Sequence, residues 1–147
     1  MEGYINHFSI WSEKPMTDLQ CDFSVFISPE DFKRFFFPFI EEQAHMVDRT
    51  IYHLDGPDSL KHLDNLLLLP ELDGFQWVPG AGSAPMSEWL ELLQKIQDAG
   101  KKLLIICEKD EVEKIVKGLK PEGILIETSC GSKSEAEKLL LDVKKWM

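Results

Sequence analysis

Apolar residues recur along this chain in two alternating patterns, short continuous runs and longer stretches with helical spacing. The short runs predict β-strands at residues 49–54, 74–78, 103–107 and 123–127. Apolar positions three and four apart follow each run and predict helices at residues 58–69, 86–99, 110–119 and from Ser134 to the C-terminus. Ser134 is expected to cap the last helix, whose inward residues are Ala136, Leu139, Leu140 and Val143. This alternation is typical of parallel α/β folds, because parallel strands need a crossover, usually helical, between them.

The first third of the chain follows the pattern less regularly. Residues 4–11 alternate loosely and predict a first strand, and residues 21–27 predict a further extended segment after a polar loop. Ser28-Pro29-Glu30-Asp31 predicts a helix start, with serine as the N-cap and proline at the first helical position. Pro38 is expected to kink this helix. Its apolar stripe is expected to pack in the core and consists of Phe32, Phe35, Phe36, Phe39 and Ile40.

Length limits the architectures that these elements can form. Roughly five strand–helix units fit either a doubly wound open sheet or part of a (β/α)8 barrel. A complete barrel needs about 250 residues, whereas this chain has 147. We therefore expect a single domain over residues 1–147 that holds at most part of a barrel.

Charge and composition exclude several classes of protein. The formal net charge of −10 argues against nucleic acid or an anionic membrane as a partner, since both need a basic surface. No apolar run approaches the length of a membrane span. The N-terminus shows no basic segment followed by an apolar stretch, so the sequence predicts no signal peptide. The three cysteines are widely spaced and indicate free thiols. These features predict a cytoplasmic protein.

The most informative residues lie at the carboxyl end of the strand at 49–54. His53 and Asp55 are two positions apart and therefore point to the same face, and Gly56-Pro57 turn the chain immediately afterwards. Chemistry in parallel α/β layers sits beyond the carboxyl ends of the strands. Cys130 follows the last predicted strand, and imidazole and thiolate together favour zinc.

Other interpretations of these residues stay open. His53 could be a hydrogen-bonded histidine at the rim and Cys130 a half-buried thiol. Cys107 ends an apolar strand and is expected to act as a small core residue, whereas His45 and His62 are expected to face solvent and His7 is ambiguous. The glycine-rich loop at 79–85 could offer backbone N–H groups to an anion, but it lacks a phosphate-binding motif and fits a tight turn better.

Several segments together resemble the uroporphyrinogen decarboxylase superfamily, which includes cobalamin-dependent methyltransferases that act with corrinoid proteins. The residues that carry the resemblance are Trp11, Phe23, the segment from Ile27 through Ser28-Pro29-Glu30-Asp31 to Phe32, Phe36, Pro38, Tyr52-His53-Leu54-Asp55-Gly56 and Ser129-Cys130-Gly131. The resemblance covers nearly the whole chain. It implies an α/β fold corresponding to the C-terminal part, about five βα units, of the family's (β/α)8 TIM barrel.

The methyltransferase branch implies a zinc site made of His53, Asp55 and Cys130. In that branch zinc is held by His-x-Cys and a distal cysteine, so Asp55 stands here in the place of the middle cysteine. The resemblance further implies that zinc binds an acceptor thiol, lowers its pKa and makes it a nucleophile toward a methyl group carried by cobalamin on a partner corrinoid protein. The expected activity is zinc-dependent methyl transfer to a thiol or similar acceptor when the barrel is complete.

Two alternatives follow from the same resemblance. The decarboxylase branch, a carboxy-lyase of porphyrin biosynthesis, uses no metal and holds its polycarboxylate substrate with arginines, and this chain has only Arg34 and Arg49. A catalytically inert half-barrel acting through assembly is the other alternative. Such a half would expose apolar surface and would pair with itself or with a missing N-terminal half-barrel.

Overall fold

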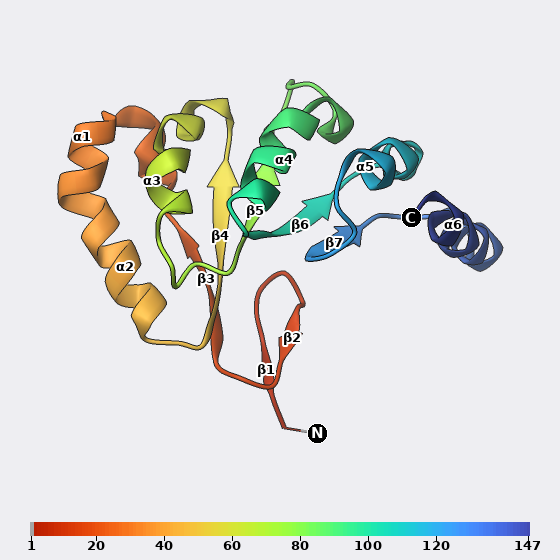
Figure 1. Cartoon of the computed structure of the whole chain (residues 1–147), viewed down its shortest axis with the longest axis horizontal. Coiled ribbons are helices and arrows are strands. Elements are labelled where there is room, and N and C mark those ends of the chain that lie inside the picture. The colour runs from red at the N-terminus through yellow and green to blue at the C-terminus, as the bar shows by residue number, and fades with distance from the viewer. Residues whose placement is uncertain (1) are drawn as a thin grey trace. The chain divides into compact units, whose positions relative to one another are not determined.

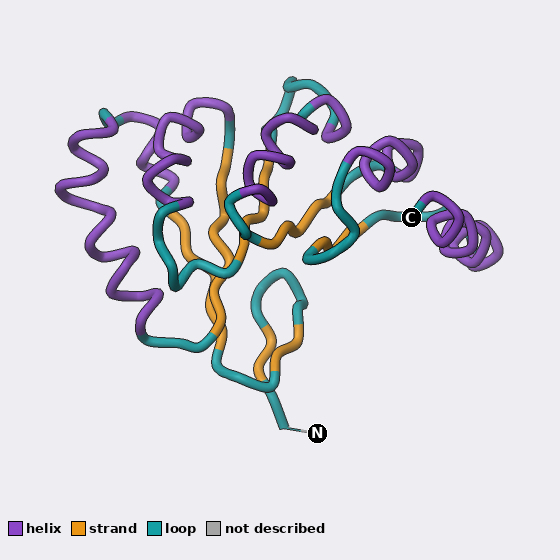
Figure 2. Tube along the Cα trace, viewed as in Figure 1, coloured by secondary structure: helices purple, strands orange, loops and turns teal. Residues whose placement is uncertain are grey.

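A computed structural model describes residues 2–147, and the chain divides into two compact units. The first unit ends at Gly80 and the second comprises Ala81–Met147. Figure 1 follows the chain through both units, and Figure 2 shows that strands and helices alternate within each.

The first unit contains a small antiparallel hairpin and a set of parallel strands. The hairpin pairs β1 (Tyr4–Ile5) with β2 (Trp11–Ser12), and the parallel strands lie in the order β3 (Met16–Gln20), β4 (Arg49–Asp55) and β5 (Gly74–Val78). The helical segments are η1 (Asp22–Phe26), α1 (Pro29–Asp31), η2 (Phe32–Phe36), α2 (Phe37–His45), η3 (Pro57–His62) and α3 (Leu63–Leu67). In Figure 1, α1, α2 and α3 lie to one side of β3 and β4, and the hairpin lies to the other.

The structure corrects the prediction for the first 27 residues. Residues 4–11 do not form one strand, because a turn at residues 6–10 folds them into the hairpin. The first parallel strand is β3, which lies in the segment expected to be a polar loop. Residues 21–27 are not extended: they contain the 3-10 helix η1, whose Ser24 is buried. Here tertiary contacts outweigh the extended preference of Phe, Val and Ile.

The predicted helix start is confirmed, but the apolar stripe behind it is only partly correct. Ser28 Oγ accepts a hydrogen bond from the Asp31 N–H at 3.1 Å, and Pro29 takes the first helical position. Pro38 has no N–H to donate. The helix contains a π-helical turn just before it, in which the Phe37 N–H donates to the Phe32 carbonyl. Phe32 and Ile40 are buried, whereas Phe35 and Phe39 are 50% and 62% exposed.

The core of the first unit lies on one face of its strands. Thr50, Tyr52 and Leu54 alternate along β4 as its buried positions, and Tyr52 packs on Phe75 of β5 with ring centroids 6.1 Å apart. Burial raises the pKa of the Tyr52 hydroxyl far above its ordinary value. The helices contribute apolar side chains such as Ile40 and Leu66 to the core.

His62 belongs to this core, contrary to the expectation that it faces solvent. Its side chain is 1% exposed, stacks on the Phe32 ring at 4.2 Å and hydrogen-bonds the Ser24 carbonyl through Nε2 at 2.9 Å. Its Nδ1 has no hydrogen-bond partner among residues 2–147. Burial lowers the pKa of this imidazole, so it is a neutral part of the core. His45 is exposed, as predicted.

The second unit repeats the strand–helix alternation on a smaller scale. Its strands β6 (Lys102–Ile106) and β7 (Ile124–Glu127) pair in parallel, and its helical segments are η4 (Met86–Glu88), α4 (Leu90–Asp98), η5 (Lys109–Glu111), α5 (Val112–Gly118) and α6 (Lys133–Trp146). Leu93, Ile96 and Ile115 from the helices are buried, as are Leu103, Leu104 and Ile105 of β6. The parallel α/β class predicted from the sequence is confirmed.

The C-terminal helix differs from the prediction in two respects. Ser132, and not Ser134, caps it, because the Glu135 N–H donates to Ser132 Oγ at 3.2 Å. Ala136, Leu139 and Val143 are half-buried as the inward face, but Leu140 is 65% exposed. Across residues 2–147, no helix has both the length and the apolar character needed to cross a membrane.

Candidate functional site

The first unit has a second sheet face, opposite its core, which carries polar side chains. The register of the parallel strands places Gln20 of β3 beside His53 of β4, and His53 beside Gln76 of β5. Asp18 lies two residues before Gln20, and Asp55 two residues after His53, so both belong to the same face. We call this face, with Asp18, Gln20, His53, Asp55 and Gln76, the open face.

His53 is held in one orientation by its neighbour on β5. Its Nδ1 hydrogen-bonds Gln76 Oε1. An amide oxygen only accepts, so Nδ1 carries the proton and Nε2 keeps its lone pair. Gln76 is itself 2% exposed, which leaves its amide little freedom to turn away. Metal-binding histidines commonly have this arrangement, in which a second group fixes the tautomer and the ring.

Asp55 ends β4 on the same face, in an exposed position. The chain turns directly after it, because Gly56 has a positive φ of 75° that side-chain-bearing residues rarely adopt. The turn is fixed by the Gly56 N–H, which donates to the Val78 carbonyl at 2.9 Å, and by Ser59 Oγ, which donates to the Gly56 carbonyl at 2.7 Å. The predicted position of His53 and Asp55, together at a strand end, is confirmed.

The loop of the N-terminal hairpin contacts the open face at two points. Asp18 accepts hydrogen bonds from Asn6 Nδ2 at 2.6 Å and from the His7 backbone N–H at 3.1 Å, and its Oδ2 lies 2.6 Å from His7 Nδ1. Phe8 is the second point: its ring centroid lies 3.8 Å from that of His7 and 6.0 Å from that of His53. The loop therefore brings a second histidine to the open face.

Cys130 lies in the second unit, in a turn between β7 and α6. The turn is fixed by Glu135, whose Oε2 accepts the Gly131 N–H at 2.7 Å and whose Oε1 pairs with Lys109. This pairing lowers the pKa of Glu135 and raises that of Lys109. The Cys130 side chain is half-buried, in agreement with one of the two interpretations of its sequence position.

Cys107 is the other cysteine of the second unit, and it is a poor candidate for thiolate chemistry. Burial, followed by the charges of Glu111, Glu108 and Asp110, raises its pKa to about 11. Its thiol is therefore protonated near neutral pH. The expectation that it behaves as a small apolar residue agrees with this environment.

The predicted zinc ligands come from both units, since His53 and Asp55 belong to the first and Cys130 to the second. Among residues 2–147, no group of three or more His, Cys, Asp and Glu side chains is placed to hold one metal ion. The three-residue site stays a prediction. What the first unit assembles is an imidazole with a free Nε2 and a carboxylate on one face, two of the donor types that zinc takes.

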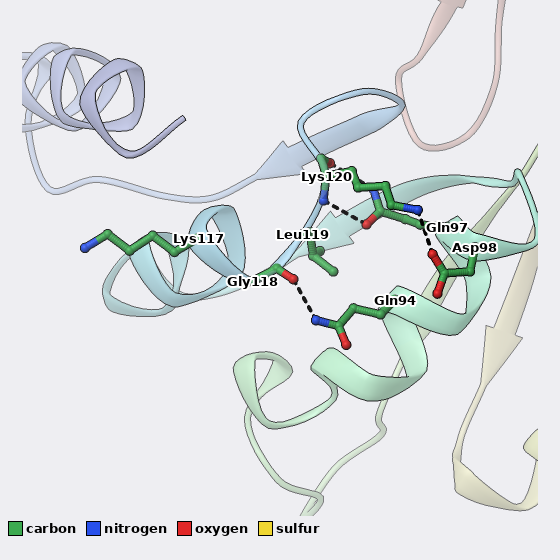
Figure 3. A pocket seen from close by; sticks show the side chains of 7 residues that line it. All are labelled: Gln94, Gln97, Asp98, Lys117, Gly118, Leu119 and Lys120. Atoms are coloured by element: carbon green, nitrogen blue, oxygen red, sulfur yellow. Dashed lines mark hydrogen bonds and ion pairs between the residues drawn. The ribbon is translucent and has the colours of Figure 1, made fainter.

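A pocket of about 280 Å3 in the second unit is structural in character. Figure 3 shows that Gln97 and Lys120 face each other: Gln97 Nε2 donates to the Lys120 carbonyl at 2.9 Å, and the Lys120 N–H donates to Gln97 Oε1 at 3.1 Å. Lys120 also pairs with Asp98 at 2.6 Å, and Gln94 donates to the Gly118 carbonyl at 2.8 Å. These hydrogen bonds and the ion pair connect α4 to the segment after α5, so the polar groups of Gln94, Gln97 and Lys120 serve the fold.

Sequence analysis gave no role to three residues that make hydrogen bonds on or beside the open face, namely His7, Asp18 and Gln76. Gln76 offered a signal, because it is a polar residue in the middle of the apolar run 74–78. His7 and Asp18 offered none, since their contact depends on how the hairpin loop folds back on β3. Comparisons of the chain with family models, curated proteins and solved structures find no match.

Proposed function

We propose that this chain is the C-terminal part of a barrel of the uroporphyrinogen decarboxylase superfamily, in the corrinoid methyltransferase branch, and that it binds zinc through His53. The observation that carries the proposal is the hydrogen bond between His53 Nδ1 and Gln76 Oε1, which leaves Nε2 free as a ligand atom. Asp55 on the same face and Cys130 of the second unit are the further proposed ligands.

The proposed chemistry is methyl transfer from a methylated corrinoid, bound to a partner protein, to a thiol. Zinc supplies a Lewis acid that lowers the pKa of a bound thiol and makes it a nucleophile near neutral pH. His53, Asp55 and Cys130 together carry the imidazole, carboxylate and thiolate donors that zinc prefers. The parallel α/β arrangement supports the proposal, because it places His53 and Asp55 at a strand's carboxyl end.

Metal analysis of the purified chain tests the zinc site. We expect one zinc per chain after loading and dialysis, and loss of that zinc in His53→Ala. His45→Ala is the matched control, since His45 is an exposed histidine of the same unit that lies on α2. A wild-type chain that retains no zinc, or a His53→Ala chain that retains as much as wild type, contradicts the proposal.

Cobalt in place of zinc tests the role of Cys130. Thiolate bound to Co2+ gives a strong near-ultraviolet charge-transfer band. We expect this band in wild type and in Cys107→Ser, and its loss in Cys130→Ser. Cys107 is the matched control because it is the second free thiol of the same unit. A band that survives in Cys130→Ser removes Cys130 from the site.

A second candidate function, assembly as a half-barrel, is supported by the apolar surface of the second unit. Ile106 of β6 and Leu125 of β7 are 44% and 49% exposed, and Leu140 and Leu141 of α6 are 65% and 60% exposed. Exposed apolar side chains on a strand pair mark an interaction surface when they are contiguous. Sedimentation analysis of wild type and Leu125→Lys checks this candidate: we expect a dimer or larger species that dissociates in the variant, and a monomeric wild type contradicts it.

A further inference from the structure

Strand β7 pairs with β6 along one edge, and within residues 2–147 no strand pairs with its other edge. The Gly123 and Glu127 carbonyls accept hydrogen bonds from the β6 side at 2.8 and 3.1 Å, so both point toward β6. Backbone groups of successive residues in a strand point to opposite sides. The N–H and C=O groups of Ile124 and Ile126 therefore point to the outer edge of β7.

The outer edge of β7 lacks the features by which edge strands usually resist pairing, namely proline, lysine and inward-pointing charges. The strand reads Ile124-Leu125-Ile126-Glu127, and its single charge is at the last position. The edge strand β3 of the first unit differs: it carries Asp18, Pro15 directly precedes it, and the hairpin loop hydrogen-bonds Asp18. An unprotected apolar edge is a place where a further strand can add.

The sheet face beside this edge exposes apolar side chains. The register pairs Leu104 with Leu125 and Ile106 with Glu127, so these four side chains share one face. Leu125 and Ile106 are both exposed. A strand added at β7 would extend this face and remove Leu125 from water, and burial of apolar surface drives association.

The charge of the second unit favours a second copy of this chain as the source of the added strand. The net charge of −10 on the whole chain opposes self-association. Residues 81–147, however, hold 11 lysines and 12 acidic residues, so the excess negative charge belongs to the first unit. Two second units can therefore approach each other with little repulsion.

We propose that β7 pairs antiparallel with β7 of a second copy across a twofold axis, a mode of assembly that rests on the second candidate function. A twofold contact uses the same surface in both copies. With the axis at Leu125, the outward backbone groups of Ile124 bond those of Ile126 in the second copy, and the reverse. Leu125 then lies directly opposite Leu125 of the second copy.

The same register brings opposite charges together. Glu127 of one copy lies opposite Gly123 of the other. The Lys102 side chain lies over Gly123, because a Cβ at Gly123 would be 3.2 Å from Lys102 Cγ. Glu127 therefore adjoins Lys102 of the other copy. A register shifted by two residues would place Glu127 opposite Leu125 instead, so the charges and the leucines together select the axis at Leu125.

Disulfide cross-linking tests the pairing and its register. Leu125→Cys is made in a chain that carries Cys21→Ser, Cys107→Ser and Cys130→Ser, and the dimer is oxidised with oxidised glutathione. Opposed residues at the axis have Cα atoms about 4.5 Å apart, which permits a disulfide. Ile106→Cys is the matched control, because Ile106 is exposed on the same face. Its two copies would lie at least about 14 Å apart, three strand spacings.

We expect a covalent dimer in Leu125→Cys and none in Ile106→Cys. Sedimentation of the wild-type chain separates the two ways in which the inference can fail. If the wild type is a monomer, assembly itself fails and the pairing of β7 fails with it. If the wild type is a dimer but Leu125→Cys does not cross-link, or Ile106→Cys cross-links equally well, the pairing of β7 is wrong and assembly through another surface stands.

Discussion

The two faces of the first unit's sheet give histidine side chains opposite environments. On the core face, His62 is 1% exposed, stacks on Phe32 and has an Nδ1 without a hydrogen-bond partner within the described residues 2–147. On the open face, His53 is half-buried and hydrogen-bonds a neighbouring amide. The core face excludes charge, whereas the open face supplies polar partners. The same residue type is therefore structural on one face and available for chemistry on the other.

This comparison shows that burial alone does not identify a functional histidine. Burial lowers the pKa of His62 and leaves it neutral, and its Nε2 is hydrogen-bonded to the Ser24 carbonyl. His53 is a candidate ligand because Gln76 hydrogen-bonds its Nδ1 and thereby leaves the lone pair of Nε2 for a metal.

Removing a large side chain from the core face should have the largest effect on stability. Phe75 is 0% exposed and packs on Tyr52. Phe75→Ala is expected to lower the free energy of unfolding by about 3–5 kcal/mol, through lost burial and the cavity left behind. Urea denaturation followed by circular dichroism measures this, with His53→Ala as the open-face counterpart. A smaller loss in Phe75→Ala than in His53→Ala contradicts the assignment of the core to the face that carries Tyr52.

Removing the amide that orients His53 should weaken metal binding more than it weakens the fold. Gln76→Leu is expected to reduce zinc affinity about 10- to 100-fold, as is usual when the partner of a ligating histidine is lost. Gln97→Leu is the matched control, because Gln97 is a buried glutamine of the second unit whose amide is used in structure. Competition with a chromogenic chelator measures both variants. Equal zinc affinity in Gln76→Leu and wild type removes Gln76 from the site.

Acidification should destabilise the core face through His62. Its folded-state pKa lies below the ordinary 6.5, so the unfolded chain takes up a proton first as the pH falls. The contribution of His62 to the free energy of unfolding is therefore constant above pH 6.5. Below pH 6.5 this contribution falls by at most about 1.4 kcal/mol per pH unit, until the pH reaches the folded-state pKa. Denaturation at several pH values should show a weaker acid dependence in His62→Gln. An unchanged dependence contradicts the assignment.

A glycine at the edge of the open face gives the smallest predicted effect. Gly56 has a φ of 75°, and a Cβ there would meet no heavy atom within 4 Å. Gly56→Ala should therefore cost only backbone strain, about 1 kcal/mol. Gly118→Ala is the comparison, because its Cβ would lie 2.8 Å from Leu90 Cδ1 and would force that side chain to move. Thermal denaturation measures the stability of both variants. A larger loss of stability in Gly56→Ala than in Gly118→Ala contradicts the prediction.

The sequence predicted the elements whose signals are local. The apolar run at 49–54, the Ser28-Pro29 helix start and the strand-end position of His53 with Asp55 all depend on neighbours in the chain. Prediction failed where distant segments decide the outcome. β3 contains Thr17 and Asp18, which made it look like a loop, and Asp18 is accommodated only because the hairpin loop supplies its hydrogen bonds.

The prediction that His62 faces solvent failed for a related reason. Its helical position gave no sign of burial, because the groups that cover it, Ser24 and Phe32, lie 38 and 30 positions away in the chain. The exposure of Phe35 and Phe39 also escaped prediction, since a π-helical turn changes the rotation of the residues around it. These features depend on tertiary packing and on the local response to Pro38.

X-ray absorption spectroscopy at the zinc edge tests the central claim that His53 Nε2 is a metal ligand. We predict a spectrum with imidazole nitrogen and one sulfur in the first coordination shell, and the same spectrum in the control variant His45→Ala. A zinc-loaded wild-type chain whose first shell holds oxygen alone, with the outer-shell imidazole signature missing, would contradict the account.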